Sequence, residues 1–298
     1  MFDVIIIGGS YAGMSAALPL VRARRKVLVI DSGLRRNRFA EAAHGILGQD
    51  GRPPGEIAAE GKRQLMLYPD LTWRDGEVVS ASPLDGGFEV GTADGDRFSG
   101  RFLILATGVS DTLPDVPGLK ERWGRSVFHC PYCHGYELNR GALGVLASGP
   151  MSLHQAQLIP QWGPTTFFTN GALTLDEEQQ RDLARRGVTV EAEAVVAVSG
   201  DRATVALKDG RAMELAGLFV ATEVAPAGPL AEQLGCKLEQ TPMGTVVVTD
   251  DFKATSIPGV FACGDMAQAA NVTLAMADGT MAAMGAHRAL LFGLPEGG

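Results

Sequence analysis

The N-terminal segment up to Asp31 constrains the fold of this chain more than any other part of it. A largely apolar run at residues 2–7 is followed by a glycine turn, by a segment rich in alanine, methionine and leucine at about 13–24, and by a second apolar run at 26–30. This succession predicts a strand, a helix and a second strand joined by a crossover connection. Because such crossovers build parallel sheets covered by helices, the predicted fold class is α/β.

The glycine turn indicates a nucleotide site. A dinucleotide fold needs glycine after its first strand, so that backbone N–H groups at a helix N-terminus can approach a pyrophosphate. It also needs an acidic residue about 20 positions further on for the ribose hydroxyls. Gly8, Gly13 and Asp31 meet these demands, and Ser10 stands where the usual pattern has its middle glycine. Serine is small enough for that position.

The rest of the chain repeats this plan. Short β-like runs between Trp73 and Phe102 predict an antiparallel meander, and a buried strand is expected at 101–106. A second alternating unit is expected from residue 142, with further hairpins after it. Its elements are strands at 142–146 and 165–169, a helix from about 152, hairpin strands at 195–199, 203–207 and 212–215, and finally a strand at 259–262 and a helix near 276–291.

Length and charge exclude several function classes. The 298 residues are enough for two domains, each with its own core. A net charge of −8 provides no basic face for a phosphate backbone, so we expect no nucleic-acid partner. The N-terminus lacks a basic region, and no apolar stretch approaches about 18 residues, so we expect no membrane association and no export. A cytoplasmic location is the resulting expectation.

The densest chemistry lies in His129-Cys130-Pro131-Tyr132-Cys133-His134. A zinc site would need a second pair of well-spaced ligands, which the remaining cysteines and histidines do not offer. Covalent haem fits the spacing formally, but there is no export signal and the crossover units already explain the fold. Two intervening residues hold the sulfurs within bonding reach and lower the pKa of one thiol. We therefore predict no metal and a dithiol that cycles to a disulfide.

Further motifs carry a family resemblance. Ala106-Thr107-Gly108 follows a predicted strand, and Gly259-Val260-Phe261-Ala262-Cys263-Gly264-Asp265 lies near the C-terminus. With the first glycine turn, these motifs resemble the pyridine nucleotide-disulfide oxidoreductases. The Cys-x-x-Cys just before a second nucleotide turn resembles the low-molecular-mass, thioredoxin reductase-like members, and the Cys-Pro-Tyr-Cys-His-Gly-Tyr-Glu run is close to a subgroup that includes thiol oxidases.

The resemblance assigns roles to individual residues. It implies FAD as the cofactor, with the second motif, Ala106, Thr107 and Gly108, closing the FAD site. It implies that Gly264 and Asp265 lie at the ribityl-phosphate region of the flavin, and that Thr273 belongs to a helix start near the flavin pyrimidine. Cys133 would face the flavin C4a, and Cys130 would exchange with the sulfur of the substrate.

The resemblance also implies the architecture. Two Rossmann-like three-layer domains are expected, each with a small antiparallel meander. The first is a discontinuous FAD-binding domain of residues 1–113 and 245–298, and the second is an NAD(P)-binding-like domain of residues 114–244 that carries the cysteine pair. Family behaviour further implies a homodimer, and a thioredoxin-like protein or a small dithiol or disulfide as the partner.

One departure from the family affects proton transfer. The familiar reductases have aspartate after the second cysteine, whereas this chain has His134. Histidine transfers protons near pH 7, so His134 is the predicted proton-transfer residue, with a neutral structural histidine as the alternative. If the early FAD loop of the family matches, His44 and Asp50 would lie near the isoalloxazine; otherwise they are ordinary loop residues.

Nicotinamide binding is the weakest part of the resemblance. The second turn, residues 147–152, keeps only Gly149 of the glycine pattern, and no arginine cluster follows the strand at 165–169. A 2′-phosphate without a cationic partner loses hydrogen bonds worth about 1.5–3 kcal/mol each. NADPH binding is therefore disfavoured unless Arg181 or Arg185 reaches the site, and use of NADH, or of no nicotinamide, stays open.

Three functions remain open at this stage. The first is an FAD-dependent reductase that passes electrons through Cys130 and Cys133 to a disulfide substrate. The second is a thiol oxidase that closes a substrate dithiol with O2 as the acceptor, and the third is a non-catalytic flavin redox sensor. Flavin bleaching by NAD(P)H supports the first, and dithiol-driven peroxide formation supports the second. No sequence feature identifies the substrate.

Overall fold

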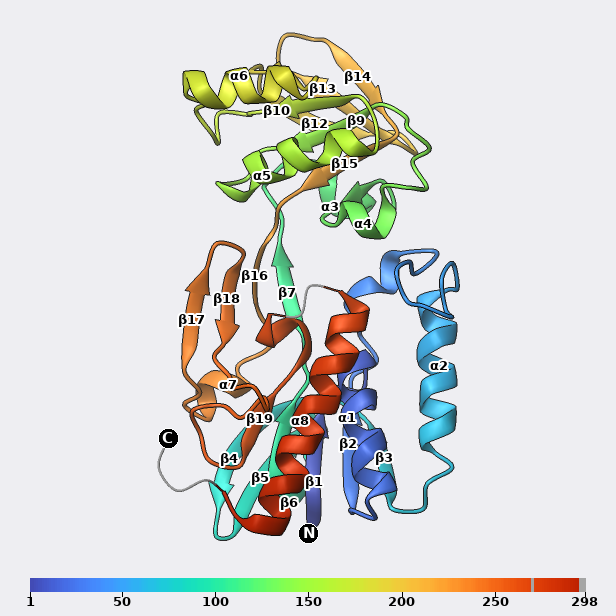
Figure 1. The fold of residues 1–298 in the computed structure, drawn as a ribbon, viewed down its shortest axis with the longest axis vertical. Coiled ribbons are helices and arrows are strands. Elements are labelled where there is room, and N and C mark those ends of the chain that lie inside the picture. The colour runs from blue at the N-terminus through green and yellow to red at the C-terminus, as the bar shows by residue number, and fades with distance from the viewer. Residues whose placement is uncertain (269–270, 295–298) are drawn as a thin grey trace. The chain divides into compact units, whose positions relative to one another are not determined.

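The computed structural model describes residues 1–268 and 271–294, and its contacts divide the chain into two compact units (Figure 1). The first unit contains residues 1–38, 53–110 and 224–298, and the second contains 39–52 and 111–223. Of the segment 245–298, expected in the FAD domain, residues 269–270 and 295–298 lie outside the described residues. The α/β fold class with two Rossmann-type domains is confirmed.

The first unit is built on one sheet with the strand order β3-β2-β1-β6-β5-β4, and β19 also pairs with β6. β1, β2, β3, β6 and β19 run parallel, while β4 and β5 form an antiparallel meander with β6. Trp73 thus belongs to a parallel strand, and the meander begins later than expected. The bounds are β1 (Phe2–Ile7), β2 (Val27–Asp31), β3 (Leu71–Asp75), β4 (Val78–Leu84), β5 (Gly87–Thr92), β6 (Arg97–Leu105) and β19 (Val260–Ala262).

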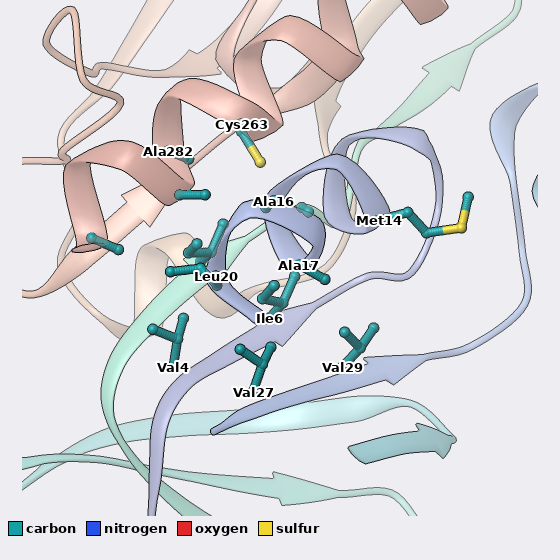
Figure 2. Close-up of a cluster of buried hydrophobic side chains, with 14 of the residues drawn as sticks. Val4, Ile6, Met14, Ala16, Ala17, Leu20, Val27, Val29, Cys263 and Ala282 are labelled. Atoms are coloured by element: carbon teal, nitrogen blue, oxygen red, sulfur yellow. The ribbon is translucent and has the colours of Figure 1, made fainter. Parts of the chain in front are cut away.

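Helices α1 (Tyr11–Arg22) and α8 (Val272–Phe292) pack closely together in this unit. A Cβ atom on Gly279 would lie 2.0 Å from the carbonyl oxygen of Ala12, so only glycine permits this approach. The shared core contains Ile6, Leu20, Cys263 and Ala282 (Figure 2). Burial raises the pKa of the Cys263 thiol, which is consistent with an inert core residue. Helix α2 (Pro54–Leu65) also belongs to this unit.

The second unit repeats the plan, as the sequence indicates. Its sheet has the order β11-β10-β9-β15-β8 with parallel pairing throughout, and a separate antiparallel meander has the order β12-β13-β14. The bounds are β8 (Val127–Phe128), β9 (Leu143–Leu146), β10 (Thr165–Phe168), β11 (Thr189–Glu191), β12 (Val195–Ser199), β13 (Ala203–Leu207), β14 (Ala212–Leu215), β15 (Gly217–Val220), α3 (Leu119–Arg122), α4 (Pro131–His134), α5 (Met151–Leu158), η2 (Ile159–Gln161) and α6 (Glu177–Arg185).

The contact-based units divide the chain close to the expected boundary at 113/114 and away from the one at 244/245. The expected boundary at 244/245 lies in a hairpin, because β17 (Leu238–Thr241) pairs antiparallel with β18 (Gly244–Val247). The chain passes between the units after residues 38 and 52, within β7 (Val109–Thr112) and at the start of β16 (Glu223–Pro226). The other short elements are η1 (Arg36–Phe39), α7 (Leu230–Gln233) and η3 (Gly264–Ala267). Over the described part of the chain, no helix combines the length and apolar character needed to cross a bilayer.

Candidate nucleotide and redox sites

The three nucleotide motifs converge in the first unit. Gly8 follows β1, Ala106 follows β6, and Gly264 begins η3 shortly after the end of β19. These three strands are neighbours in parallel register. The carboxyl ends of adjacent parallel strands meet at one edge of a sheet, which is where ligands of α/β proteins bind. The structure thus brings together motifs that are far apart in the sequence.

Close backbone contacts explain the glycines of the first turn. A Cβ atom on Gly8 would lie 2.3 Å from the Ala106 carbonyl oxygen, and one on Gly13 would lie 1.8 Å from the Gly8 carbonyl oxygen. Ser10 is the N-cap of α1 and makes no capping hydrogen bond with its side chain. Asp31 ends β2 and accepts a 2.9 Å hydrogen bond from the Gly9 amide, so the acid lies at the turn.

A polar cluster beside this turn was missed by the sequence analysis. Arg36 Nη1 contacts Asp265 Oδ2 at 2.9 Å, and Asn37 Nδ2 donates to the Tyr11 hydroxyl at 3.2 Å. Arg35 Nε and Asn37 Oδ1 are buried without a hydrogen-bond partner among the described residues. Buried polar atoms are normally satisfied, so orphaned atoms beside a phosphate-type turn fit a bound dinucleotide. The signal in the sequence was the Arg35-Arg36-Asn37-Arg38 run, which begins four residues after the end of β2.

The other expected FAD residues lie in the same unit. Thr107 Oγ1 lies 3.5 Å from Met266 Sδ, and Gly108 and Gly264 both have positive φ angles, of 72° and 77°. Thr273 lies in the first turn of α8, whose Asn271 cap accepts a hydrogen bond from the Leu274 amide. These residues fit an FAD site that Gly8, Gly13, Asp31 and Asp265 would form, and their individual roles remain predictions.

The cysteine pair lies in the second unit. Cys130 and Cys133 form a disulfide with a Cα–Cα distance of 5.4 Å. Cys130 is the N-cap of the short helix α4, which follows β8 and contains Cys133 and His134. The other two cysteines, Cys236 and Cys263, are buried. Cys130 and Cys133 are therefore the cysteines of the chain that are not buried.

His134 has the surroundings of a packed, neutral histidine. Its ring stacks on Phe128 with a centroid distance of 4.3 Å, and its Nδ1 is buried without a hydrogen-bond partner among the described residues. Burial lowers the pKa of His134 because the charged ring would lose hydration. These features agree with the alternative in which His134 is a neutral structural residue. A proton-transfer role for His134 stays a prediction.

His44 and Asp50 lie in the second unit with the cysteine pair. His44 Nδ1 contacts Asp50 Oδ2 at 3.4 Å, and His44 Nε2 contacts Glu137 Oε1 at 3.4 Å. Glu137 belongs to the segment that follows α4, so the loop at 39–52 contacts the redox segment. The sequence analysis did not pair these residues, because His44 and Glu137 are far apart along the chain. Whether His44 also approaches a flavin stays a prediction.

The second nucleotide-type turn is occupied by its own serine. Ser152 Oγ accepts hydrogen bonds from the amides of Ser148, at 2.9 Å, and Gly149, at 3.4 Å. Pro150 has no N–H, and Ser152 is fully buried. The N–H groups that would bind a pyrophosphate in this fold are thus paired inside the turn.

The residues after β10, where the family has an arginine cluster for the 2′-phosphate, also differ from a nucleotide site. Asn170 follows β10, and its Oδ1 accepts a 2.8 Å hydrogen bond from the Val195 amide. The two arginines considered for this role contact carboxylates on their own helix: Arg181 lies 3.3 Å from Glu177, and Arg185 lies 3.2 Å from Asp182. Because such exposed ion pairs are weak, the stronger reasons against a nucleotide here are the turn capped by Ser152 and the hydrogen bond made by Asn170. The residues present do not fit a bound NADPH.

Within residues 1–268 and 271–294, no group of three or more histidine, cysteine, aspartate or glutamate side chains is arranged to hold a metal ion.

A dinucleotide-type turn in one unit and a Cys-x-x-Cys disulfide in the other are the features of a disulfide oxidoreductase. A family model described as pyridine nucleotide-disulphide oxidoreductase matches residues 2–288, and the chain belongs to this family. It is thus an oxidoreductase of the thioredoxin reductase-like, FAD-dependent kind, as the sequence motifs indicate.

Individual relatives cover nearly the whole chain. The thioredoxin reductase tcpT of Claviceps purpurea is 36% identical over 304 residues, which are 97% of this chain and 94% of the relative. A crystal structure of an oxidoreductase from Agrobacterium tumefaciens is 53% identical with a TM-score of 0.95, covering 98% of this chain and 99% of that one. Thioredoxin reductase from Streptococcus pyogenes is 26% identical with a TM-score of 0.85, covering 98% of both chains.

The polar cluster predicts a determinant of FAD affinity. Replacing Arg36 with alanine removes a cation beside the first turn and leaves Asp265 without this partner. Charge-assisted hydrogen bonds contribute about 1.5–3 kcal/mol, so we expect FAD to bind about 10- to 100-fold more weakly to Arg36→Ala. Titration of the apoprotein with FAD measures this, and Arg38→Ala, whose guanidinium donates to the Arg35 carbonyl, is the control. Equal affinities of the two variants would contradict the assignment.

The lowered pKa of His134 predicts a pH dependence of stability. The unfolded chain takes up a proton below the ordinary histidine pKa of 6.5, whereas the folded chain keeps this ring neutral. Stability present above that pH is therefore lost on acidification. We expect the free energy of unfolding, measured in urea, to fall less on acidification in His134→Phe than in the wild type. His154→Phe, at an exposed position, should behave as the wild type does; an unchanged dependence in His134→Phe would show that the ring is not kept neutral.

Proposed function

We propose that this protein is an FAD-dependent dithiol/disulfide oxidoreductase that passes electrons between flavin and the Cys130–Cys133 disulfide, and between this pair and a substrate disulfide or dithiol. The observation that carries the proposal is the disulfide at the start of α4, in a chain whose other cysteines are buried. FAD, when bound, supplies a two-electron donor and acceptor. The first unit supports its binding through the glycine turn, Asp31, Asp265 and the cluster around Arg36.

The roles of the two cysteines follow the family pattern. Cys130, the N-cap of α4, exchanges with the sulfur of the substrate, and Cys133, within the helix, communicates with the flavin. A helix N-terminus favours a thiolate, because the positive end of the helix dipole stabilises negative charge, although α4 is short and the effect is correspondingly small. His134 would provide proton transfer only if its packed ring can exchange with solvent.

Two directions of electron flow are proposed for this chemistry. The reductase direction, with a thioredoxin-like protein as the partner, is supported by relatives that are named thioredoxin reductases. The oxidase direction, from a substrate dithiol through the cysteine pair and flavin to O2, is supported by the second nucleotide-type turn. Because Ser152 satisfies the Ser148 and Gly149 amides and Pro150 supplies none, this turn is poorly suited to the pyrophosphate of a nicotinamide donor.

An anaerobic titration separates these directions. The purified protein would be mixed in turn with NADPH, NADH and dithiothreitol while the flavin absorbance is followed. We expect dithiothreitol to bleach the flavin and neither nicotinamide to do so, with peroxide formed when air is admitted. Rapid bleaching by a nicotinamide would assign the reductase direction. Cys133→Ser should lose dithiol-driven bleaching while retaining bound FAD, and bleaching that persists in this variant would refute the cysteine mechanism.

A homodimer built through the first unit is part of the proposal. Helix α8 exposes a series of apolar side chains, namely Leu274, Met276, Met284 and Leu291. Exposed apolar side chains along one helix are typical of surfaces that are covered in an assembly. Light scattering after size-exclusion chromatography should give twice the mass of one chain, and Met284→Glu should shift the protein toward the monomer. A monomeric wild type would contradict this part of the proposal.

A further inference from the structure

His44 is held between two carboxylates in the second unit. Its Nδ1 faces Asp50 and its Nε2 faces Glu137, each at 3.4 Å. The Asp50 carboxylate is itself fixed by a 2.8 Å hydrogen bond from the Gly45 amide, which is the main reason that its pKa is lowered. The His44 side chain is 19% exposed, and that of Glu137 is 43% exposed. The ring orientation is thus set on one side by Asp50, and the other ring nitrogen is directed at Glu137.

This arrangement lies beside the redox helix. Glu137 follows Cys133 by four residues, through a segment in which Gly135 keeps helical backbone angles. The pKa of His134 provides a second indication of proximity. Burial is the largest influence on it, but Glu137 raises this pKa and His44 lowers it, so both groups act on the residue next to Cys133. The titratable groups that face His44 are therefore Asp50 on its own loop and Glu137 and His134 on the redox segment.

We propose that His44 is a positioning residue for the thiol–disulfide exchange, and that it holds the Glu137 carboxylate where it can accept the proton lost by a substrate thiol. This inference rests on the proposed function. Asp50 orients the imidazole, the imidazole orients Glu137, and Glu137 is exposed enough to meet a substrate. His134 is less suited to this task, because its ring is stacked on Phe128 and its Nδ1 is buried.

With a dithiol substrate, the proton of one substrate thiol passes to Glu137, and the resulting thiolate attacks one sulfur of the Cys130–Cys133 disulfide. The S–S bond breaks, and its electron pair goes to the other cysteine sulfur as a thiolate. The second substrate thiol gives its proton to the cysteine thiolate already formed and attacks the substrate sulfur of the mixed disulfide. The bond between that sulfur and the other cysteine breaks, so that this cysteine leaves as a thiolate and the substrate leaves with its own disulfide. The cysteine pair is left reduced by two electrons, and the proton on Glu137 returns to a cysteine thiolate or to solvent.

The test is a double-mutant cycle on the anaerobic reduction of the holoenzyme by dithiothreitol, followed by stopped-flow absorbance of the flavin. A positioned proton acceptor contributes about 100-fold or more to such a step, so we expect Glu137→Gln to react about 100-fold more slowly. His44→Ala should react about 10-fold more slowly, as an acceptor that is present but misplaced. The double variant should be no slower than Glu137→Gln, because His44 acts only through Glu137.

A further readout separates positioning from a general structural role. His44→Gln, whose amide can donate to Glu137, should recover part of the rate lost in His44→Ala. His44→Gln also keeps the test decisive if the alanine variant does not fold.

Matched controls come from exposed residues of the same types. His154→Ala on α5 and Glu178→Gln on α6 should both react at the wild-type rate. Rate losses that multiply in the double variant, or a rate in His44→Gln no higher than that in His44→Ala, would overturn the inference. Loss of the reaction in Cys133→Ser together with either of these results would leave the proposed function intact and remove only the role of His44. A reaction that persists in Cys133→Ser would instead remove the proposed function.

Discussion

The parallel pairing of β1, β6 and β19 is the constraint on which the rest of the first unit depends. β6 pairs with β1 through Ile5 and Leu103 and with β19 through Val260 and Leu103, and all three residues are fully buried. Because a shift of one residue would turn every side chain to the opposite face of the sheet, burial on both faces fixes this register. The same register brings the ends of the three strands together, and with them the turns that begin at Gly8, Ala106 and Gly264.

The sequence was informative wherever structure follows from neighbouring residues. The crossover unit at the N-terminus, the repeat of its plan after residue 142 and the disulfide across Cys130 and Cys133 each depend on a short stretch of chain. The limits appeared where pairing is non-local. Trp73 was expected in a meander, but its strand pairs in parallel with β2. The hairpin of β17 and β18 covers the expected boundary at 244/245, because turn residues look alike in a hinge and in a hairpin.

The candidate sites follow the same division. Glycine spacing and the Cys-x-x-Cys pair are local patterns with a definite chemical meaning. The contact between His44 and Glu137 joins segments that are far apart in sequence, and a single sequence contains nothing that pairs them. Arg35 and Asn37 became informative only through their buried, unpartnered atoms, which are properties of the folded chain. Ser152 could be read as an ordinary helix residue until its hydroxyl was found on two amides of the turn.

The two nucleotide-type turns share a strand–turn–helix backbone but differ in whether their polar groups are already paired within the protein. Beside the first turn, Arg35 and Asn37 have buried polar atoms without a partner within the described chain, so a bound dinucleotide could complete their contacts. In the second turn, a serine hydroxyl pairs the amides from within, and a proline removes one donor. A ligand there would have to break these internal hydrogen bonds in order to form its own, and the exchange leaves little net free energy for binding. Because the free energy of an internal hydrogen bond and that of a ligand contact are similar, the buried Ser152 hydroxyl competes directly with a ligand for the Ser148 and Gly149 amides.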